Sequence, residues 1–222
     1  MSSRIVQFVM LAAVSSALAG GSSHEVKAQQ FEGPKSQVPP SGALPPAPKR
    51  LLGETIPDDP VQRAKLLDNL YAHLAAAEDE RAAEQVAGAI ARLWRATGGD
   101  TVKVLLDRAH KAVNDKELAL ALQLLDAVVA VAPDCAEGWS QRAHVLYLEN
   151  EVERALGDLR RALALDPNHF KALDALAHIL REIGQKEGAL KAYEKVLEVH
   201  PFWPGARQAV DELMREVGGQ RT

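Results

Sequence analysis

The sequence predicts an all-α fold, a solenoid of antiparallel helix pairs. The main observation is a period of 34 residues that runs through three copies between residues 102 and 203, because this is the length of one helix–turn–helix unit. The second observation is composition, since 47% of the chain is hydrophobic and only 5% is aromatic. Few bulky rings and many small apolar residues suit helices that pack closely in an array.

The three copies share residue types at fixed positions. The best-matched copy includes Trp139 to Pro167, and moving 34 residues in either direction finds the same types. The shared positions are alanine at the eighth, alanine at the twentieth and proline at the thirty-second, namely Ala109, Ala143 and Ala177, then Ala121, Ala155 and Ala189, then Pro133, Pro167 and Pro201. Small residues let two helices cross closely, and proline ends the second helix of a pair. The period therefore predicts where the helices pack as well as where they end.

This pattern resembles the tetratricopeptide repeat (TPR). The resemblance gives three repeats, at 102–135, 136–169 and 170–203, and implies a right-handed superhelical solenoid whose first helices line a concave groove. The sequence departs from the family pattern at the seventh position, where Arg108 and Arg142 replace leucine. These two helices can pack normally only if the arginine stems lie along apolar surface.

Two further helical segments flank the three copies. Residues 61–100 have apolar residues at helical spacing on both sides of an acidic stretch at 78–80. In the 34-residue frame Ala75 and Ala87 take the eighth and twentieth positions, while Gly99 replaces the proline. We expect a divergent helix pair that caps the N-terminal end as a degenerate repeat. Residues 204–217 predict a C-terminal capping helix with a polar outer face.

The first sixty residues predict export and a linker. Residues 1–19 have the three parts of a secretory signal peptide, and a second acceptable cleavage point follows residue 28. The apolar run is about 14 residues long, shorter than the roughly 20 that span a bilayer, so we expect no integral membrane segment after cleavage. Residues 20–60 hold eight of the 12 prolines and predict a disordered, Pro-rich linker.

The composition and motifs argue against several classes of function. A formal net charge of −4 argues against nucleic acid as a partner, because such a partner needs a basic face. The single cysteine, Cys135, excludes an intrachain disulfide and metal sites made of cysteine pairs. No phosphate-binding loop, dinucleotide-binding glycine run or zinc-protease motif occurs, so we predict no cofactor. Ser140 and His144 lie one helical turn apart but lack an orienting third group. We therefore expect no enzyme.

The candidate site is the predicted groove. The groove-facing positions of the family give the partner-binding residues His110, Glu137, Ser140, Gln141, His144, Tyr147, Lys171, Asp174, His178 and Arg181. Chaperone-binding members of the family clamp a C-terminal carboxylate with lysines and asparagines at defined groove positions. Those positions here hold Leu106, His110, Gln141, Lys171 and Ala175. Only Lys171 matches, so the resemblance does not imply that clamp.

Three groove residues form a histidine ladder. His110, His144 and His178 each take the ninth position of a repeat, and neighbouring first helices lie roughly 10 Å apart. The ladder can be polar lining copied by duplication, a contact surface for a partner peptide, or a metal site. The spacing is wide for three imidazoles that share one ion, and we predict no metal site.

The architecture predicts a non-enzymatic scaffold or adaptor that binds a protein or peptide in its groove. The order of export signal, linker, divergent pair and three repeats resembles small exported periplasmic TPR proteins of alphaproteobacteria. That resemblance implies a periplasmic location and a role in cell-envelope integrity or assembly. Two alternatives stay open. One is a periplasmic metal-binding or hydrolytic protein that uses the histidine ladder, and the other is an envelope scaffold that binds glycan.

Overall fold

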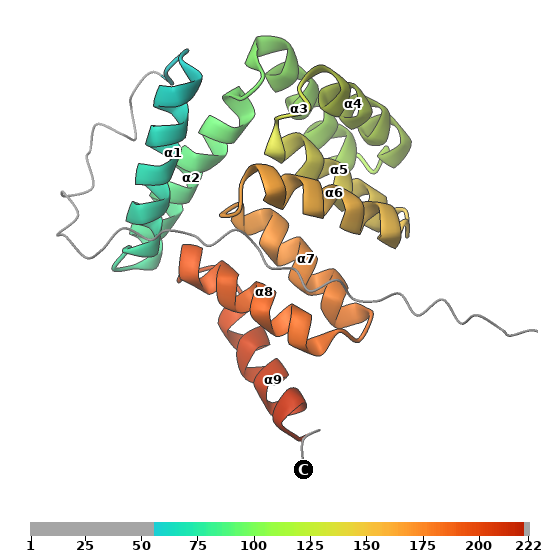
Figure 1. Cartoon of the computed structure of the whole chain (residues 1–222). Helices are drawn as coiled ribbons and strands as arrows, with labels where there is room; N and C mark the ends of the chain where they lie inside the picture. Colours follow the sequence, from blue (N-terminus) through green and yellow to red (C-terminus); the bar gives the residue numbers. More distant parts are fainter. Residues whose placement is uncertain (1–55, 220–222) are drawn as a thin grey trace, which may run out of the picture. The chain divides into compact units, whose positions relative to one another are not determined.

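The structure is a computed structural model that describes residues 56–219. Over this range the chain forms nine α-helices and no strand (Figure 1), which confirms the all-α prediction. The helices are α1 (Pro60–Ala75), α2 (Glu80–Ala96), α3 (Gly99–Asn114), α4 (Leu118–Val131), α5 (Ala136–Leu148), α6 (Val152–Leu165), α7 (Phe170–Glu182), α8 (Lys186–Val199) and α9 (Ala206–Gly219). None of these helices is long and apolar enough to cross a membrane. The predicted signal peptide at 1–19, and the predicted linker as far as residue 55, lie outside the described residues.

The turn inside each repeat has the same geometry in all three copies. The backbone takes a positive φ of 61°, 62° and 79° at Lys116, Asn150 and Gly184. The N–H of the next residue then donates, at 2.8 Å in each copy, to the carbonyl five positions earlier. These pairs are Glu117 with Ala112, Glu151 with Leu146, and Gln185 with Leu180. A left-handed residue with this bond closes a helix, so the same local device ends the first helix of every repeat.

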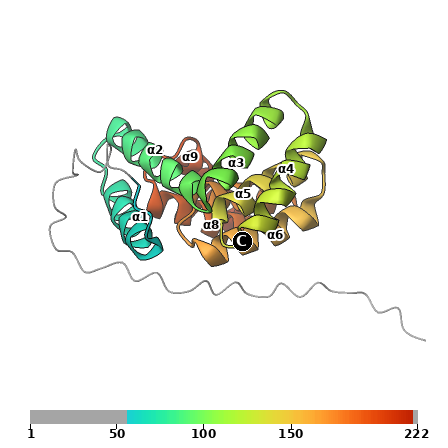
Figure 2. The same ribbon diagram turned by 90° about the horizontal axis from the view of Figure 1, so that it is seen from above.

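The repeats pack through the small residues that define the period. The six alanines at the eighth and twentieth positions are all buried. Gly138 brings α5 close to α4, because a Cβ added there would lie 2.6 Å from Val128 Cγ1. α3 packs on α4, α5 on α6 and α7 on α8, and α9 then packs on α8. The succession can be followed by the labels in Figure 1, and Figure 2 shows α3 to α6 from above.

Arg142, at the unusual seventh position, is held by ion pairs. Its Nε and Nη2 donate to the two carboxylate oxygens of Asp158 at 2.7 and 2.8 Å, and its Nη1 donates to Asp126 at 2.8 Å. The guanidinium carbon also lies 4.8 Å from the centre of the Trp139 ring. Arg142 on α5 thus joins α4 to α6. Arg108, its counterpart on α3, is exposed.

The N-terminal helix pair departs from the arrangement expected of a capping repeat. α2 leads directly into α3, but α2 also contacts α5, and α1 contacts α8. In a regular solenoid each repeat touches only its neighbours. Residues 61–100 therefore do more than cap the first repeat, because they also pack on the second and third.

Candidate partner-binding groove

The predicted groove positions continue onto α9. Gln208 and Glu212 stand 34 positions after Asp174 and His178, so the first-helix frame extends past the third repeat. Seven residues on α5, α7 and α9 occupy these positions and are at least partly exposed. We call them the groove face: His144, Tyr147, Asp174, His178, Arg181, Gln208 and Glu212.

The groove face contains a hollow between α7 and α9. Its volume is about 210 Å³, and its lining includes Asp174, Arg181 and Glu212 together with Tyr193 of α8. Arg181 Nη2 donates to Glu212 Oε2 at 2.7 Å, and Gln208 Nε2 donates to Glu212 Oε1 at 2.9 Å. These two bonds fix the side of the hollow that α9 forms.

Burial and charge shift several pKa values around the hollow. Burial raises the pKa of Asp174, while the Trp203 indole and His178 oppose that shift. Hydrogen bonds from Gln208 and Arg181 lower the pKa of Glu212. Burial, and then the charge of Asp174, raises the pKa of Tyr193 to about 12. With two carboxylates and one guanidinium, the lining carries two negative charges and one positive charge. The net charge of the hollow is therefore negative while His178 is neutral.

One end of the groove face lies on α5. The Tyr147 hydroxyl donates to Glu182 Oε1 at 2.7 Å, which links α5 to the end of α7. His144 is exposed, and desolvation lowers the pKa of its imidazole. Both side chains are accessible, and their contact with a partner stays a prediction.

The histidine ladder lies at the surface. His110, His144 and His178 are all exposed, and His178 Nε2 lies 3.8 Å from Asp174 Oδ1. Within residues 56–219, no group of three or more histidine, cysteine, aspartate or glutamate side chains is placed to hold a metal ion.

Two predicted groove residues need correction, because Glu137 and Ser140 are only 4% and 7% exposed. Glu137 Oε2 lies 3.0 Å from His169 Nε2, and Glu137 Oε1 accepts a hydrogen bond from Gln141 Nε2 at 2.7 Å. α2 packs on α5, the helix that carries both residues. Neither Glu137 nor Ser140 is therefore offered to a partner in this structure.

The burial of Glu137 belongs to a larger cluster that joins the N-terminal pair to the repeats. The ring of Trp94 on α2 stacks on the His169 ring, with centroids 3.8 Å apart and planes within 7°. Lys171 Nζ lies 4.0 Å from Glu137 Oε1 and 5.7 Å from the Trp94 ring centre. Burial alone would raise the pKa of Glu137, but the bond to His169 and the charges of His169 and Lys171 lower it. Gln141 and Lys171, both predicted groove residues, thus lie at the edge of this cluster.

Asp166 is the centre of the same junction. Its Oδ2 accepts a hydrogen bond from the Tyr71 hydroxyl at 2.6 Å and another from Trp94 Nε1 at 3.0 Å. Its Oδ1 accepts from the backbone N–H of Asn168 at 3.1 Å. Burial, with the charge of Asp166, raises the pKa of Tyr71 well above its ordinary value. One carboxylate of the second repeat therefore binds both helices of the N-terminal pair.

Sequence reasoning missed this junction, although the repeats contain a signal for it. At the thirty-first position the three copies have Ala132, Asp166 and His200, and at the thirty-fourth they have Cys135, His169 and Trp203. In the first repeat these positions hold small buried core residues, whereas in the second they hold Asp166 and His169, which also contact the N-terminal pair. Such positions are candidates for contacts outside the stack.

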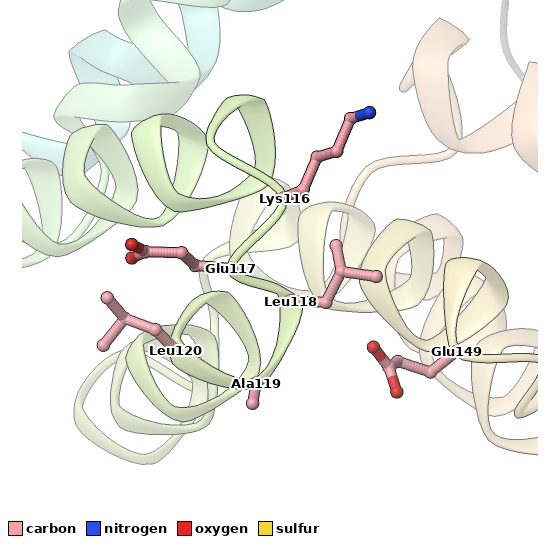
Figure 3. A pocket seen from close by; sticks show the side chains of 6 residues that line it. All are labelled: Lys116, Glu117, Leu118, Ala119, Leu120 and Glu149. Atoms are coloured by element: carbon pink, nitrogen blue, oxygen red, sulfur yellow. The ribbon is translucent and has the colours of Figure 1, made fainter.

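A second hollow, near the turn between α3 and α4, has no convergent chemistry. Its volume is about 480 Å³, and Lys116, Glu117 and Glu149 supply its charged groups. Figure 3 shows these three side chains pointing in different directions over an open surface. The groove face is the better candidate site.

Comparisons with known proteins agree with the repeat pattern. Family profiles described as tetratricopeptide repeat match residues 136–169 and 170–201. A curated TPR repeat-containing protein of Rhizobium etli is 35% identical over 75 residues, which is 34% of this chain and 37% of that protein. The chain therefore matches little more than a third of the length of this relative.

Two solved structures are also similar. The first TPR domain of Spaghetti (RPAP3), bound to an HSP90 peptide, gives a TM-score of 0.50 at 21% identity and covers 52% of this chain and 91% of that one. The Sgt2 TPR domain of Aspergillus fumigatus gives 0.49 at 24% identity, with 53% and 80% covered. The first likeness shows the shared fold. With two repeats matched in sequence and helix pairs in the same register, residues 136–201 of this chain are tetratricopeptide repeats.

Proposed function

We propose that this protein is a non-enzymatic scaffold that binds a protein or peptide segment on its groove face, in the periplasm. The observation that carries the proposal is the groove face itself. Its seven polar side chains come from three successive first helices and remain accessible, and the five on α7 and α9 line a hollow. Polar groups held in fixed positions around a hollow are typical of recognition sites.

The fold supports the same class of function. TPR domains are protein-interaction modules, and the similar RPAP3 domain was solved with a bound HSP90 peptide. This chain departs from a carboxylate clamp, since Lys171 is the only matching residue and lies close to the buried Glu137. We therefore propose a partner whose recognition does not depend on a free C-terminal carboxylate.

The proposal is non-enzymatic because the possible catalytic groups do not converge. Ser140, whose hydroxyl lies one helical turn from His144 in the sequence, is buried. Within the described range no histidine belongs to a group of three or more ligand-type residues that could hold a metal ion. No observation supports a hydrolytic site or a metal site. We expect no heat change when the protein is titrated with zinc.

The groove is tested by selecting peptides from a random display library on the full chain. The His144→Ala/Tyr147→Ala variant removes two accessible groove side chains, and Arg160→Ala changes an exposed residue of α6 outside the groove face. We expect selected peptides to lose about tenfold or more in affinity for the double variant and to bind Arg160→Ala normally. Equal binding to all three proteins would refute the groove. Competition by soluble envelope glycan would instead favour the glycan-binding alternative.

Export is proposed from the sequence alone, and it is tested separately. Residues 1–40 fused to a phosphatase that is active only outside the cytoplasm should give activity, and the exported product should begin at Gly20 or Gln29. Charged residues placed in the apolar run should abolish the activity. Activity that survives this change would contradict the predicted signal peptide. A parent fusion without activity would contradict a periplasmic scaffold, and the proposed role in envelope integrity would fall with it.

A further inference from the structure

The hollow between α7 and α9 is lined by a tyrosine whose ring is buried and whose hydroxyl is left without a hydrogen bond to any described residue. Tyr193 lines the hollow and is only 1% exposed. Its ring meets the His178 ring edge to face at a centroid distance of 5.6 Å. Among residues 56–219 its hydroxyl makes no hydrogen bond. The hydroxyl oxygen is not among the buried unpaired atoms of the described residues, so it is accessible to a ligand that enters the hollow.

The carboxylate of Asp174 is also incompletely paired. Glu212 receives bonds from both Arg181 and Gln208. Among the described residues Asp174 pairs with no lysine or arginine, and its neighbours are the Trp203 indole and His178, whose Nε2 lies 3.8 Å from Asp174 Oδ1. The Asp174 side chain is 22% exposed, so one part of it faces the hollow and the rest is desolvated. A half-buried carboxylate pairs more strongly with a cation than a solvated one does.

These two groups select the charge and size of a ligand. The negative hollow repels a carboxylate and attracts a cation. An ammonium or guanidinium group brings several N–H donors, and Asp174 and Tyr193 supply acceptor oxygens. A hollow of about 210 Å³ accepts the end of one side chain.

We propose that this hollow binds the side chain of a lysine or arginine from the partner, with Asp174 as the ion-pair acceptor and the Tyr193 hydroxyl as the second contact. Arg181 does not compete for Asp174, because Glu212 holds it at 2.7 Å. The inference rests on the proposed function, since it specifies which segment of a partner the groove face recognises.

The test uses basic probes and the full chain labelled with nitrogen-15. Nα-acetyl-lysine amide and Nα-acetyl-arginine amide are titrated separately, with neutral Nα-acetyl-glutamine amide as the control. We expect only the basic probes to shift the amide signals of Asp174, His178, Gly205 and Gln208. Asp174→Asn should weaken binding about tenfold or more, and Tyr193→Phe, which removes only the hydroxyl, should weaken it several-fold. Asp211→Asn, at an exposed aspartate of α9 outside the hollow, should bind like the parent chain.

The outcomes separate this inference from the proposed function. Absent shifts, equal shifts with the glutamine probe, or unchanged affinity in both Asp174→Asn and Tyr193→Phe would overturn the basic-residue site. Groove-dependent peptide binding in the same preparation would then leave the scaffold function standing. Conversely, a hollow that binds the basic probes in a chain that selects no peptides would contradict the scaffold function alone. If Asp174→Asn loses the parent spectrum, the Tyr193→Phe titration decides.

Discussion

At the scale of single residues, the three repeat turns place different side chains in the same backbone conformation. Lys116, Asn150 and Gly184 all have a positive φ. A left-handed conformation costs an ordinary residue roughly 1–2 kcal/mol. We expect Lys116→Gly to raise the free energy of unfolding and Gly184→Ala to lower it by about 1 kcal/mol. Urea unfolding followed by circular dichroism measures both changes.

Asn150 provides the control for this pair of variants. Asparagine tolerates the left-handed region better than lysine does, so Asn150→Gly should change stability less than Lys116→Gly. A Cβ added at Gly184 meets nothing within 4 Å, and its effect therefore reports backbone conformation alone. Three equal and small effects would mean that these turns adjust without strain.

His200 predicts how stability depends on pH. It is 4% exposed, its Nδ1 has no hydrogen-bond partner, and it packs against Phe170 and Trp203. Burial lowers the pKa of His200 in the folded state. Above the pKa of histidine in the unfolded chain, about 6.5, His200 is neutral in both states and its burial stabilises the fold. This stabilisation is lost as the pH falls through the lower pKa that His200 has in the folded state. We expect the free energy of unfolding to decrease below about pH 6.5.

The measurement compares unfolding of the parent chain and His200→Leu at several pH values. The variant should have a shallower loss of stability in the mildly acidic range, because leucine does not titrate. His144, whose pKa desolvation also lowers, contributes in the same direction, so His144→Gln is measured in parallel. Identical pH slopes for the parent chain and His200→Leu would contradict the assignment.

At the scale of helices, the ion pairs of Arg142 replace the apolar contact that a leucine would make at this position. It lies on α5 and pairs with Asp126 of α4 and with Asp158 of α6. Arg142→Leu restores the residue type usual at this position but leaves the buried Asp158 without its partner. We expect this variant to lose about 1–3 kcal/mol of unfolding free energy. Chemical denaturation checks the value.

A double variant shows whether the loss comes from the unpaired carboxylate. Arg142→Leu/Asp158→Ala removes both charges, so part of the stability should return. If the double variant is less stable than Arg142→Leu, the arginine acts through packing on Trp139, 4.8 Å away, and the ion pairs matter little.

The helices and their register could be predicted from the sequence because their causes are local and repeated. Small residues at two fixed positions, a proline at a third and a common turn recur in each copy, and each acts over a few residues. The expected groove positions Asp174, His178 and Arg181 follow from the same frame, and the structure brings them to one hollow. Tyr193 escaped the sequence reasoning because it occupies a second-helix position reserved for packing.

The position of the N-terminal pair could not be predicted in this way. Tyr71 and Trp94 look like ordinary apolar positions of amphipathic helices, and the Asp166-Pro167 pair looks like a helix stop. The hydrogen bonds between them span 95 and 72 residues. A local sequence pattern gives no information about a contact between residues so far apart in the chain. Because this junction was not predicted, Glu137 and Ser140 were wrongly expected to be open to a partner.

At the scale of the whole described chain, the junction at Asp166 changes how the solenoid holds together. A linear array is stabilised by neighbouring interfaces alone and can open from either end. Here α1 contacts α8 and α2 contacts α5, so the first helices depend on the middle and last repeats. We therefore expect the N-terminal pair to depend on this junction and to lose its protection when the junction is broken.

Asp166→Ala tests this coupling. The change leaves the Tyr71 hydroxyl and the Trp94 indole without their acceptor, and each buried group that is left unpaired costs about 1–3 kcal/mol. Hydrogen exchange followed by mass spectrometry should show faster exchange in α1 and α2, with α7 and α8 nearly unchanged.

Asp134→Ala, at an exposed aspartate in the loop before α5, should leave every helix protected as before. Should α1 and α2 keep their protection in Asp166→Ala, the apolar contacts of Trp94 with His169 and Phe170 would be sufficient to hold the pair. If α7 and α8 instead lose protection to the same extent as α1 and α2, the whole region unfolds as one unit and the pair is part of the fold's core.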